Sequence, residues 1–380
     1  MHTFSVPEKI VTGEHAFDQL KEHPITRAFI ICDPFIEKSG MLSKLLAVLQ
    51  DMGASHQVFS GIRPDPDTGL VTDGVEQLLA YRPDAVIAVG GGSAIDAAKA
   101  MSFLYQKSSG AKKPFCVAVP TTSGTGSEAT NFAVITDKDT HIKYPLVDDV
   151  LLPDLAILEP SMVCSVPPTV TADTGMDVLT HAVEAYVSTG ADDFSDALAE
   201  KAVRLIDTWL PVAFRDGKNM EARGHVHNAS CMAGVSFTHA KLGINHSVAH
   251  AIGGRYRIPH GRANAIVLPY VMAYNAGLGD AKAETRATAS RYAALARLIG
   301  MEAFSDQQAV RSLISRIEKM NADFGIPRCL RAAGIEESAF LADVSELAGI
   351  ALADACTATT PRPVDQASME AIMKKVYYGR

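Results

Sequence analysis

The stretch VIAVGGGSAIDAAKA, residues 86–100, places three glycines between an apolar run and an alanine-rich segment. The apolar run predicts a buried strand, and the following segment predicts a helix. Because glycine has no Cβ, the turn can approach a phosphate closely, and the helix N-terminus offers unpaired N–H groups. Ser93 and Asp96 fit an N-cap and capping-box pair. The stretch predicts a phosphate-binding turn, with a plain tight turn as the alternative.

The same strand–helix alternation extends on both sides of this turn as far as about residue 160. Such alternation is typical of a parallel sheet flanked by helices. Strands are predicted at 27–33, 56–62, 85–93 and 115–120, and helices at 43–53, 72–84 and 94–105.

Beyond residue 163 the strand signals nearly vanish, and long helical periodicities follow one another. A chain of 380 residues is also too long for one ordinary core. We therefore predict an α/β dinucleotide-binding domain at 1–163 and an all-helical domain at 164–380. The helices expected after the boundary are 170–188, 192–210, 219–239, 245–253, 262–278, 283–300, 306–323, 336–355 and 364–378.

The second half carries a cluster of potential metal ligands. Asp177 and His181 are four residues apart, as are His246 and His250, so each pair would project from one face of a helix. His260 follows in a turn bounded by Pro and Gly. One carboxylate and three imidazoles suit a divalent transition metal with a position left for a substrate oxygen. The alternative is that these are ordinary core or surface histidines.

Composition narrows the classes of function. A net charge of −8 leaves no basic stripe for a nucleic acid. The six cysteines are scattered without a CxxC pair, which suits a reducing compartment. We see neither a secretory signal nor an apolar run long enough to cross a bilayer. We therefore expect a cytoplasmic protein without nucleic-acid or membrane partners.

Two further features indicate a nucleotide cofactor. The segment AVPTTSGTGSEAT, residues 118–130, places hydroxyls and glycines directly after a predicted strand, where loops often bind ligands. Asp33 ends the first predicted strand, where a carboxylate can accept ribose hydrogen bonds and repel a 2′-phosphate. Its position before the glycine turn does not satisfy the usual GxGxxG order.

Taken together, four motifs resemble the iron-containing (group III) alcohol dehydrogenases. They are GGGSAIDAAKA (90–100), PTTSGTGSE (120–128), GMDVLTHAVEAY (175–186) and NHSVAHAIGGRYRIPHGRANAIVLP (245–269). The resemblance covers nearly the whole chain and implies a dehydroquinate synthase-like fold. Within the family, the segments IKYPLVDDVLLPDLAILEPSMVCSVPP (142–168), DFSDALAEKA (193–202) and TPRP (360–363) resemble the 1-propanol dehydrogenases of propanediol-utilisation microcompartments.

The resemblance also implies roles for individual residues. The implied metal ligands are Asp177, His181, His246 and His260. The implied cofactor residues are Asp33, Gly90, Gly91, Gly92, Ser93, Asp96, Thr121, Thr122, Ser127 and Lys143. His250 matches a histidine beside the metal, where it would relay a proton or fill a purely steric role. Asp33 matches the position linked to NAD over NADP.

These roles imply an enzyme that uses NAD(H) to interconvert a small aldehyde and a primary alcohol. Propanal and 1-propanol are the leading substrate pair. Iron follows from the resemblance, and zinc is the competing metal because the ligands contain no thiolate. Lactaldehyde, 1,2-diol, butanol and glycerol dehydrogenases are alternatives on the same scaffold. A dehydroquinate synthase-type lyase and a non-catalytic microcompartment protein are more distant ones. We also expect a homodimer formed through the alternating segment 2–13, and cargo status in a microcompartment.

Overall fold

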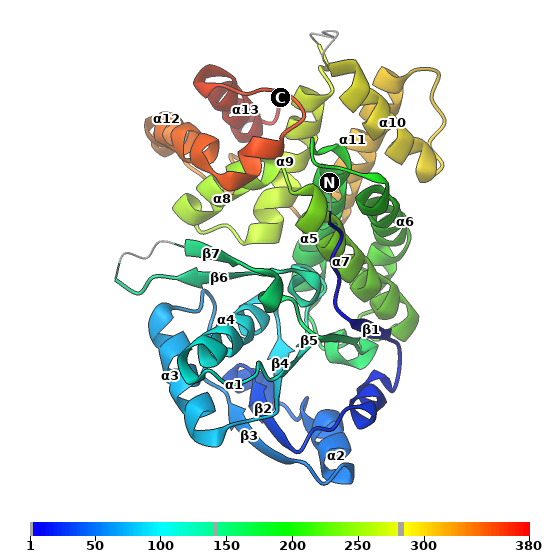
Figure 1. Ribbon diagram of the computed structural model, residues 1–380. Helices are drawn as coiled ribbons and strands as arrows, with labels where there is room; N and C mark the ends of the chain where they lie inside the picture. Colours follow the sequence, from blue (N-terminus) through cyan, green and yellow to red (C-terminus); the bar gives the residue numbers. More distant parts are fainter. Residues whose placement is uncertain (1–2, 140–142, 280–284) are drawn as a thin grey trace. The chain divides into compact units, whose positions relative to one another are not determined.

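A computed structural model describes residues 3–139, 143–279 and 285–380 (Figure 1). The chain packs into two compact units. The first comprises residues 1–166 and 217–235, and the second comprises 167–216 and 236–380. Packing thus divides the chain at 166/167, beside the predicted boundary of 163/164, and places part of one later helix in the first unit.

The first unit is built on a six-stranded sheet in the order β1-β8-β5-β4-β2-β3, in which all paired strands are parallel. All four strands expected from the sequence are present. The strands of this sheet are β1 (Lys9–Thr12), β2 (Arg27–Ile31), β3 (Ser55–Phe59), β4 (Ala85–Gly90), β5 (Phe115–Pro120) and β8 (Leu155–Leu158).

Helices accompany the sheet because both of its faces are apolar. Side chains alternate along β2, so Ile30 joins one hydrophobic core while Phe29 and Ile31 join another. Every residue of β4 is buried, as expected for a central strand of a parallel sheet. The α-helices entirely within this unit are α1 (Pro34–Lys38), α2 (Ser43–Asp51), α3 (Thr68–Tyr81) and α4 (Gly92–Ser109).

Some elements of the first unit were not expected from the sequence. The strands β6 (Phe132–Thr136) and β7 (Lys143–Val147) form a separate antiparallel pair. The segment 2–13, expected to pair with a partner chain, contributes β1, which pairs with β8 of its own chain. Short 3-10 helices complete the unit: η1 (Ala16–Glu22), η2 (Ser127–Ala129), η3 (Asp149–Leu151) and η4 (Pro160–Val163).

The described residues of the second unit form helices and no strand, as predicted, and nearly every helix lies within a few residues of its expected bounds. One helix, α7 (Met220–Ala240), contributes residues to both units. The others are α5 (Pro168–Val187), α6 (Asp193–Arg215), α8 (Ile244–Tyr256), α9 (His260–Asn275), α10 (Arg286–Leu298), α11 (Asp306–Asp323), α12 (Glu337–Ala353), η6 (Ala355–Thr359) and α13 (Gln366–Tyr378).

None of the helices in the described ranges 3–139, 143–279 and 285–380 combines the length with the apolar character that a bilayer crossing requires.

Candidate metal centre and phosphate-binding edge

Helix α5 carries polar groups in an unusually buried position. All residues from Gly175 to Val187 are buried, and among them Asp177 and His181 lie one turn apart. Burial raises the pKa of Asp177, although His181 and the amide of Asn264 act in the opposite direction. A buried carboxylate of this kind needs a cation or strong hydrogen-bond donors.

Helix α9 brings His260 to this carboxylate. The sequence placed His260 in a turn, which is wrong. His260 is the first residue of α9, and Pro259 precedes it as the helix N-cap. Next to it, a Cβ on Gly261 would lie only 2.1 Å from the carbonyl oxygen of Asp173 and 3.2 Å from Cβ of Asp177. Only glycine therefore permits the start of α9 to lie directly against α5.

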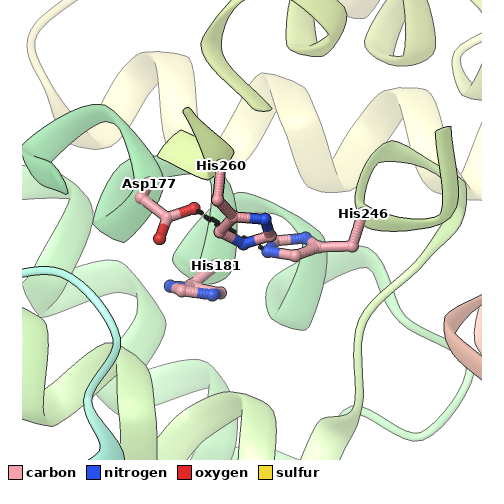
Figure 2. A group of neighbouring side chains, drawn as sticks. All are labelled: Asp177, His181, His246 and His260. Atoms are coloured by element: carbon pink, nitrogen blue, oxygen red, sulfur yellow. Dashed lines mark ion pairs between the residues drawn. The ribbon is translucent and has the colours of Figure 1, made fainter. Parts of the chain in front are cut away.

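Helix α8 supplies the remaining imidazole, and the four side chains converge (Figure 2). One potential ligand atom from each of Asp177, His181, His246 and His260 lies within 4.8 Å of the others. The Oδ1 atom of Asp177 is 3.5 Å from Nε2 of His260 and 3.9 Å from Nε2 of His246. Three nitrogens and one oxygen at this spacing fit a divalent transition metal.

Glu184 fixes the imidazole of His246 from behind. Its carboxylate accepts hydrogen bonds from the backbone N–H groups of Asn245 and His246, at 2.7 and 3.3 Å, and lies 2.5 Å from Nδ1 of His246. The same carboxylate therefore satisfies the first turn of α8 and orients a ligand, as carboxylates commonly do behind metal-binding histidines. Burial raises the pKa of Glu184 to about 8 and lowers that of His246 well below its usual range.

Asn264 identifies the tautomer of His246. Its amide nitrogen donates to Oδ1 of Asp177 at 2.7 Å and faces Nε2 of both His246 and His260 at 3.1 Å. The orientation of the amide is set because Asn245 donates to its oxygen. A donation to Nε2 of His246 requires a lone pair there, which places the proton of the neutral imidazole on Nδ1, beside the carboxyl group of Glu184. Nε2 is thus ready to bind a metal.

His250 lies beside this group but outside it. It follows His246 by one turn of α8, and its ring stacks on that of His260 with 5.3 Å between centroids. Its side chain is 42% exposed, and Nδ1 lies 2.8 Å from Oδ2 of Asp354. Burial opposes ionisation of Asp354, but the bonds from His250 and Cys356 lower its pKa to about 2. Nδ1 of His250 is therefore engaged by a carboxylate, which leaves Nε2 for other partners.

The first unit gathers its predicted cofactor residues at the carboxyl ends of neighbouring strands. Asp33 follows β2, and the glycine turn follows β4, the strand beside it. The chain runs from β2 outward to β3 and from β4 in the opposite direction to β5, so a topological switch lies between β2 and β4. Open parallel sheets bind their ligands at such a point.

The glycine turn and the hydroxyl loop 118–130 lie against each other. The backbone N–H of Thr121 donates to the carbonyl of Gly90 at 3.0 Å, and a Cβ on Gly91 would lie 3.3 Å from Oγ1 of Thr122. A Cβ on Gly92 would lie 2.9 Å from a methyl of Thr125. The structure therefore brings together the glycines and hydroxyls that the sequence placed thirty residues apart.

The expected capping box of Ser93 and Asp96 is wrong. Gly91 is the N-cap of α4 and makes no side-chain cap. The carboxylate of Asp96 instead accepts from Oγ of Ser127 at 2.5 Å and from the backbone N–H of Val134 at 3.0 Å. Because the side chain of Asp96 lies toward the hydroxyl loop, it accepts no hydrogen bond from the N–H groups at the start of α4.

Lys99 strengthens the same network from the interior. Its ammonium donates to Oγ of Ser127 and to two oxygens of Thr130, and burial lowers its pKa to about 8 against the influence of Asp96. Asp96, Lys99 and Ser127 thus hold the loop in place.

Of Lys143, only the backbone belongs to the described structure. Lys143 is the first residue of β7 and pairs with Thr136, and its side chain lies outside the described part.

Comparison with known proteins gives the family. Residues 7–160 match the family described as iron-containing alcohol dehydrogenase, and residues 171–377 match its C-terminal region. The chain belongs to the iron-containing alcohol dehydrogenase family. It is 43% identical to the 1-propanol dehydrogenase PduQ of Citrobacter freundii over 99% of this chain and 100% of the relative. It is 38% identical to an NADPH-dependent butanol dehydrogenase of Clostridium saccharobutylicum, over 100% and 99%.

A solved structure of 1,3-propanediol oxidoreductase is similar with a TM-score of 0.91 and 32% identity, over 99% of this chain and 100% of that one. As a member of the family, this iron-containing alcohol dehydrogenase is an oxidoreductase with the fold that the sequence motifs implied. Two residues at its candidate metal centre, Glu184 and Asn264, were not found from the sequence. Both follow metal-ligand candidates at helical spacing: Glu184 comes seven residues after Asp177, and Asn264 four after His260.

The buried Glu128 of this dehydrogenase predicts a pH-dependent stability. Burial raises its pKa from 4.5 to about 7, so the folded chain keeps a proton that the unfolded chain has lost. The wild type should lose on the order of 3 kcal/mol as pH rises from 4.5 through 7. Glu128→Gln removes this loss and should be more stable than the wild type at pH 8, measured by the thermal midpoint.

The exposed Glu76 of α3 provides the control, because its carboxylate stays in water in both states. Glu76→Gln should leave the pH profile of the midpoint unchanged. An identical profile for wild type and Glu128→Gln would contradict the assignment.

Proposed function

We propose that the protein is a metal-dependent, NAD(H)-linked alcohol dehydrogenase that interconverts a small aliphatic aldehyde and its primary alcohol, with propanal and 1-propanol as the substrates. The observation that carries the proposal is the convergence of Asp177, His181, His246 and His260 in a member of this family. The 43% identity to a 1-propanol dehydrogenase over full length supports the substrate.

These four side chains would hold the metal. When bound, a divalent ion acts as a Lewis acid on the alcohol or carbonyl oxygen, and the nicotinamide carries the hydride. The chain's own contribution is preorganisation: α5, α8 and α9 fix the ligands, Glu184 keeps His246 in the binding tautomer, and burial excludes water from three of the four ligands. Iron is proposed from the family, and zinc fits the same donors.

NAD(H) would bind at the switch point between β2 and β4. The turn formed by Gly90, Gly91 and Gly92 and the unpaired N–H groups at the start of α4 would receive the pyrophosphate. We propose Asp33 as the ribose partner that disfavours NADP. One oxygen of Asp33 caps α1 by accepting from Phe35 and Ile36, which fixes the direction of the carboxylate. Ser93, Thr121, Thr122 and Lys143 remain proposed cofactor contacts.

His250 is proposed to relay the proton between the substrate oxygen and solvent. Its partial exposure gives it a route to water, and Asp354 holds Nδ1 so that Nε2 is the exchanging atom. His250→Ala should lower turnover about 100-fold while metal content stays that of the wild type. Anaerobic kinetics with metal analysis measures both. Turnover equal to the wild type would remove the relay.

A butanol dehydrogenase is the second candidate, since a relative of that activity is 38% identical over the full length and uses NADPH. Lactaldehyde and glycerol dehydrogenases stay behind it. Anaerobic purification with metal analysis should be followed by oxidation of NADH and NADPH against propanal, butanal, acetaldehyde, lactaldehyde and dihydroxyacetone. We expect propanal with NADH to give the highest kcat/KM. A preference for butanal with NADPH would select the second candidate, and inactivity with all five would reject the proposal.

We also propose that the protein is a homodimer and that it is located in the cytoplasm, inside a bacterial microcompartment. The end position of β1 in the sheet supports the dimer, because a terminal strand has one edge that no strand of the described chain covers. The microcompartment follows from the resemblance to the 1-propanol dehydrogenases of propanediol utilisation.

A further inference from the structure

A second group of potential metal ligands lies beside the first in the helical unit. It consists of His250 on α8, Asp354 at the N-cap of η6, and Cys356 within η6. One nitrogen, one oxygen and one sulfur from these residues lie within 4.8 Å of one another. None of the three belongs to the four-ligand group around Asp177. This second group also differs from the first in chemistry, since it contains a thiol.

The three residues meet through one carboxylate. Nδ1 of His250 lies 2.8 Å from one oxygen of Asp354, and Sγ of Cys356 lies within 4.8 Å of an oxygen of the same carboxylate. The backbone N–H of Cys356 and the hydroxyl of Ser247 donate to its other oxygen, at 2.8 and 3.3 Å. Backbone and hydroxyl donors therefore hold the carboxylate, and an imidazole and a thiol lie close to it.

Such a cluster is the protonated form of a nitrogen–oxygen–sulfur metal site. A divalent ion can take the place of the protons on His250 and Cys356, because the three heavy atoms already lie within 4.8 Å of one another. The thiol loses its proton to solvent, and the neutral imidazole moves its proton from Nδ1 to Nε2, so one proton is released for each ion bound. A thiolate favours zinc and cadmium over the hard ions magnesium and calcium.

The group is accessible from solvent. The side chains of His250 and Asp354 are 42% and 20% exposed, and Cys356 is one of two cysteines that are not fully buried. An ion can therefore reach it without opening the fold. Its occupation would engage Nδ1 of His250, reverse the tautomer of that ring, and place a proton on Nε2.

We propose that His250, Asp354 and Cys356 form a second, inhibitory site for a thiophilic divalent cation, of which zinc is the representative. The site itself is independent of the function proposed above. The inhibitory effect rests on that function, because it acts through the relay assigned to His250. Zinc in excess would thus inhibit the enzyme without displacing the metal of the four-ligand site.

Cadmium tests the site through its sulfur-to-metal charge-transfer absorption in the ultraviolet. The four-ligand site has no sulfur, so this band reports only thiolate binding. Titration of the metal-loaded, full-length protein with Cd²⁺ should give the band with one ion per chain and a parallel loss of propanal reduction, reversed by a chelator. Cys356→Ser keeps a hydrogen-bond donor to Asp354, so it should retain basal activity.

In Cys356→Ser the band should disappear and the inhibitory cadmium concentration should rise roughly 100-fold or more, since even residues behind metal ligands are worth 10–100-fold. Cys164→Ser is the matched control, because Cys164 is the other partly buried cysteine. It should behave as the wild type. His250→Asn keeps the thiol, and the cadmium concentration that gives half of the band should rise at least about tenfold.

No band in the wild type, or a band that persists in Cys356→Ser, would overturn the site. Equal inhibition of wild type and Cys356→Ser would place the effect at the four-ligand site and overturn the inhibitory role. If the protein reduced no aldehyde at all, the function proposed above would fail, while the band and its stoichiometry would still decide the second site.

Discussion

Replacing His260 by alanine is expected to remove the bound metal and to lower turnover at least about 1,000-fold. The ligand set falls from four to three, and Lewis-acid stabilisation of several kcal/mol is lost, where each 1.36 kcal/mol is a factor of ten in rate. The ring of His260 is 43% exposed, so its truncation leaves no buried cavity. Metal analysis after anaerobic purification and steady-state kinetics measure the two effects together.

His239→Ala is the matched control, because His239 also lies in the histidine-rich stretch of the chain but outside the four-ligand group. It should keep its metal and its turnover. Full metal occupancy in His260→Ala would refute the assignment of this ligand, whatever the activity.

Replacing Glu184 by alanine is expected to give the largest loss of stability among single changes at the metal centre. The substitution leaves Nδ1–H of His246 and two backbone N–H groups buried without their acceptor. Each orphaned donor costs about 1–3 kcal/mol, so the three together should cost about 3–9 kcal/mol. Metal affinity should also fall 10–100-fold, because His246 loses the group that sets its tautomer. Thermal unfolding and competition with a chromogenic chelator measure the two losses.

The control is Glu200→Ala. Glu200 lies on α6 outside the ligand group and accepts one hydrogen bond, at 2.9 Å, from Tyr186, which shares α5 with Glu184. Its loss should cost about 1 kcal/mol and leave metal affinity unchanged. If Glu184→Ala and Glu200→Ala were equally stable and bound metal equally well, Glu184 would have no special role at the centre.

The periodicity of the sequence was sufficient to predict the parallel sheet, its flanking helices and the helical second unit. The apolar runs at β2, β4 and β5 and the helical periodicity of α11 are local signals, so they could be recognised without knowing which segments they pack against. The short strands β1 and β8 could not be identified together, because a parallel pair joins segments about 145 residues apart, and no local pattern records that pairing.

The candidate metal ligands could be found from the sequence for the same reason: Asp177 and His181 are one helical turn apart. Glu184 continues that face, yet nothing local shows that its carboxylate reaches the start of α8, 62 residues further along the chain. The prediction for Asp96 was wrong for the opposite reason, because a local pattern suggested a contact that the structure does not make. Its spacing from Ser93 fits a capping box, but the loop that contains Ser127 provides a competing partner from 31 residues away.

The close approach that Gly261 permits also has a consequence for the lifetime of the protein in the cell. Because the candidate ligands come from α5, α8 and α9, a bound ion would act as a cross-link among three segments of one unit. At a thousand times its Kd, an ion that binds only the folded chain adds about 4 kcal/mol to the free energy of unfolding. Chains made when metal is scarce would lack this increment and be removed sooner by proteases. Metal supply would then set how much enzyme persists as well as how fast each copy works.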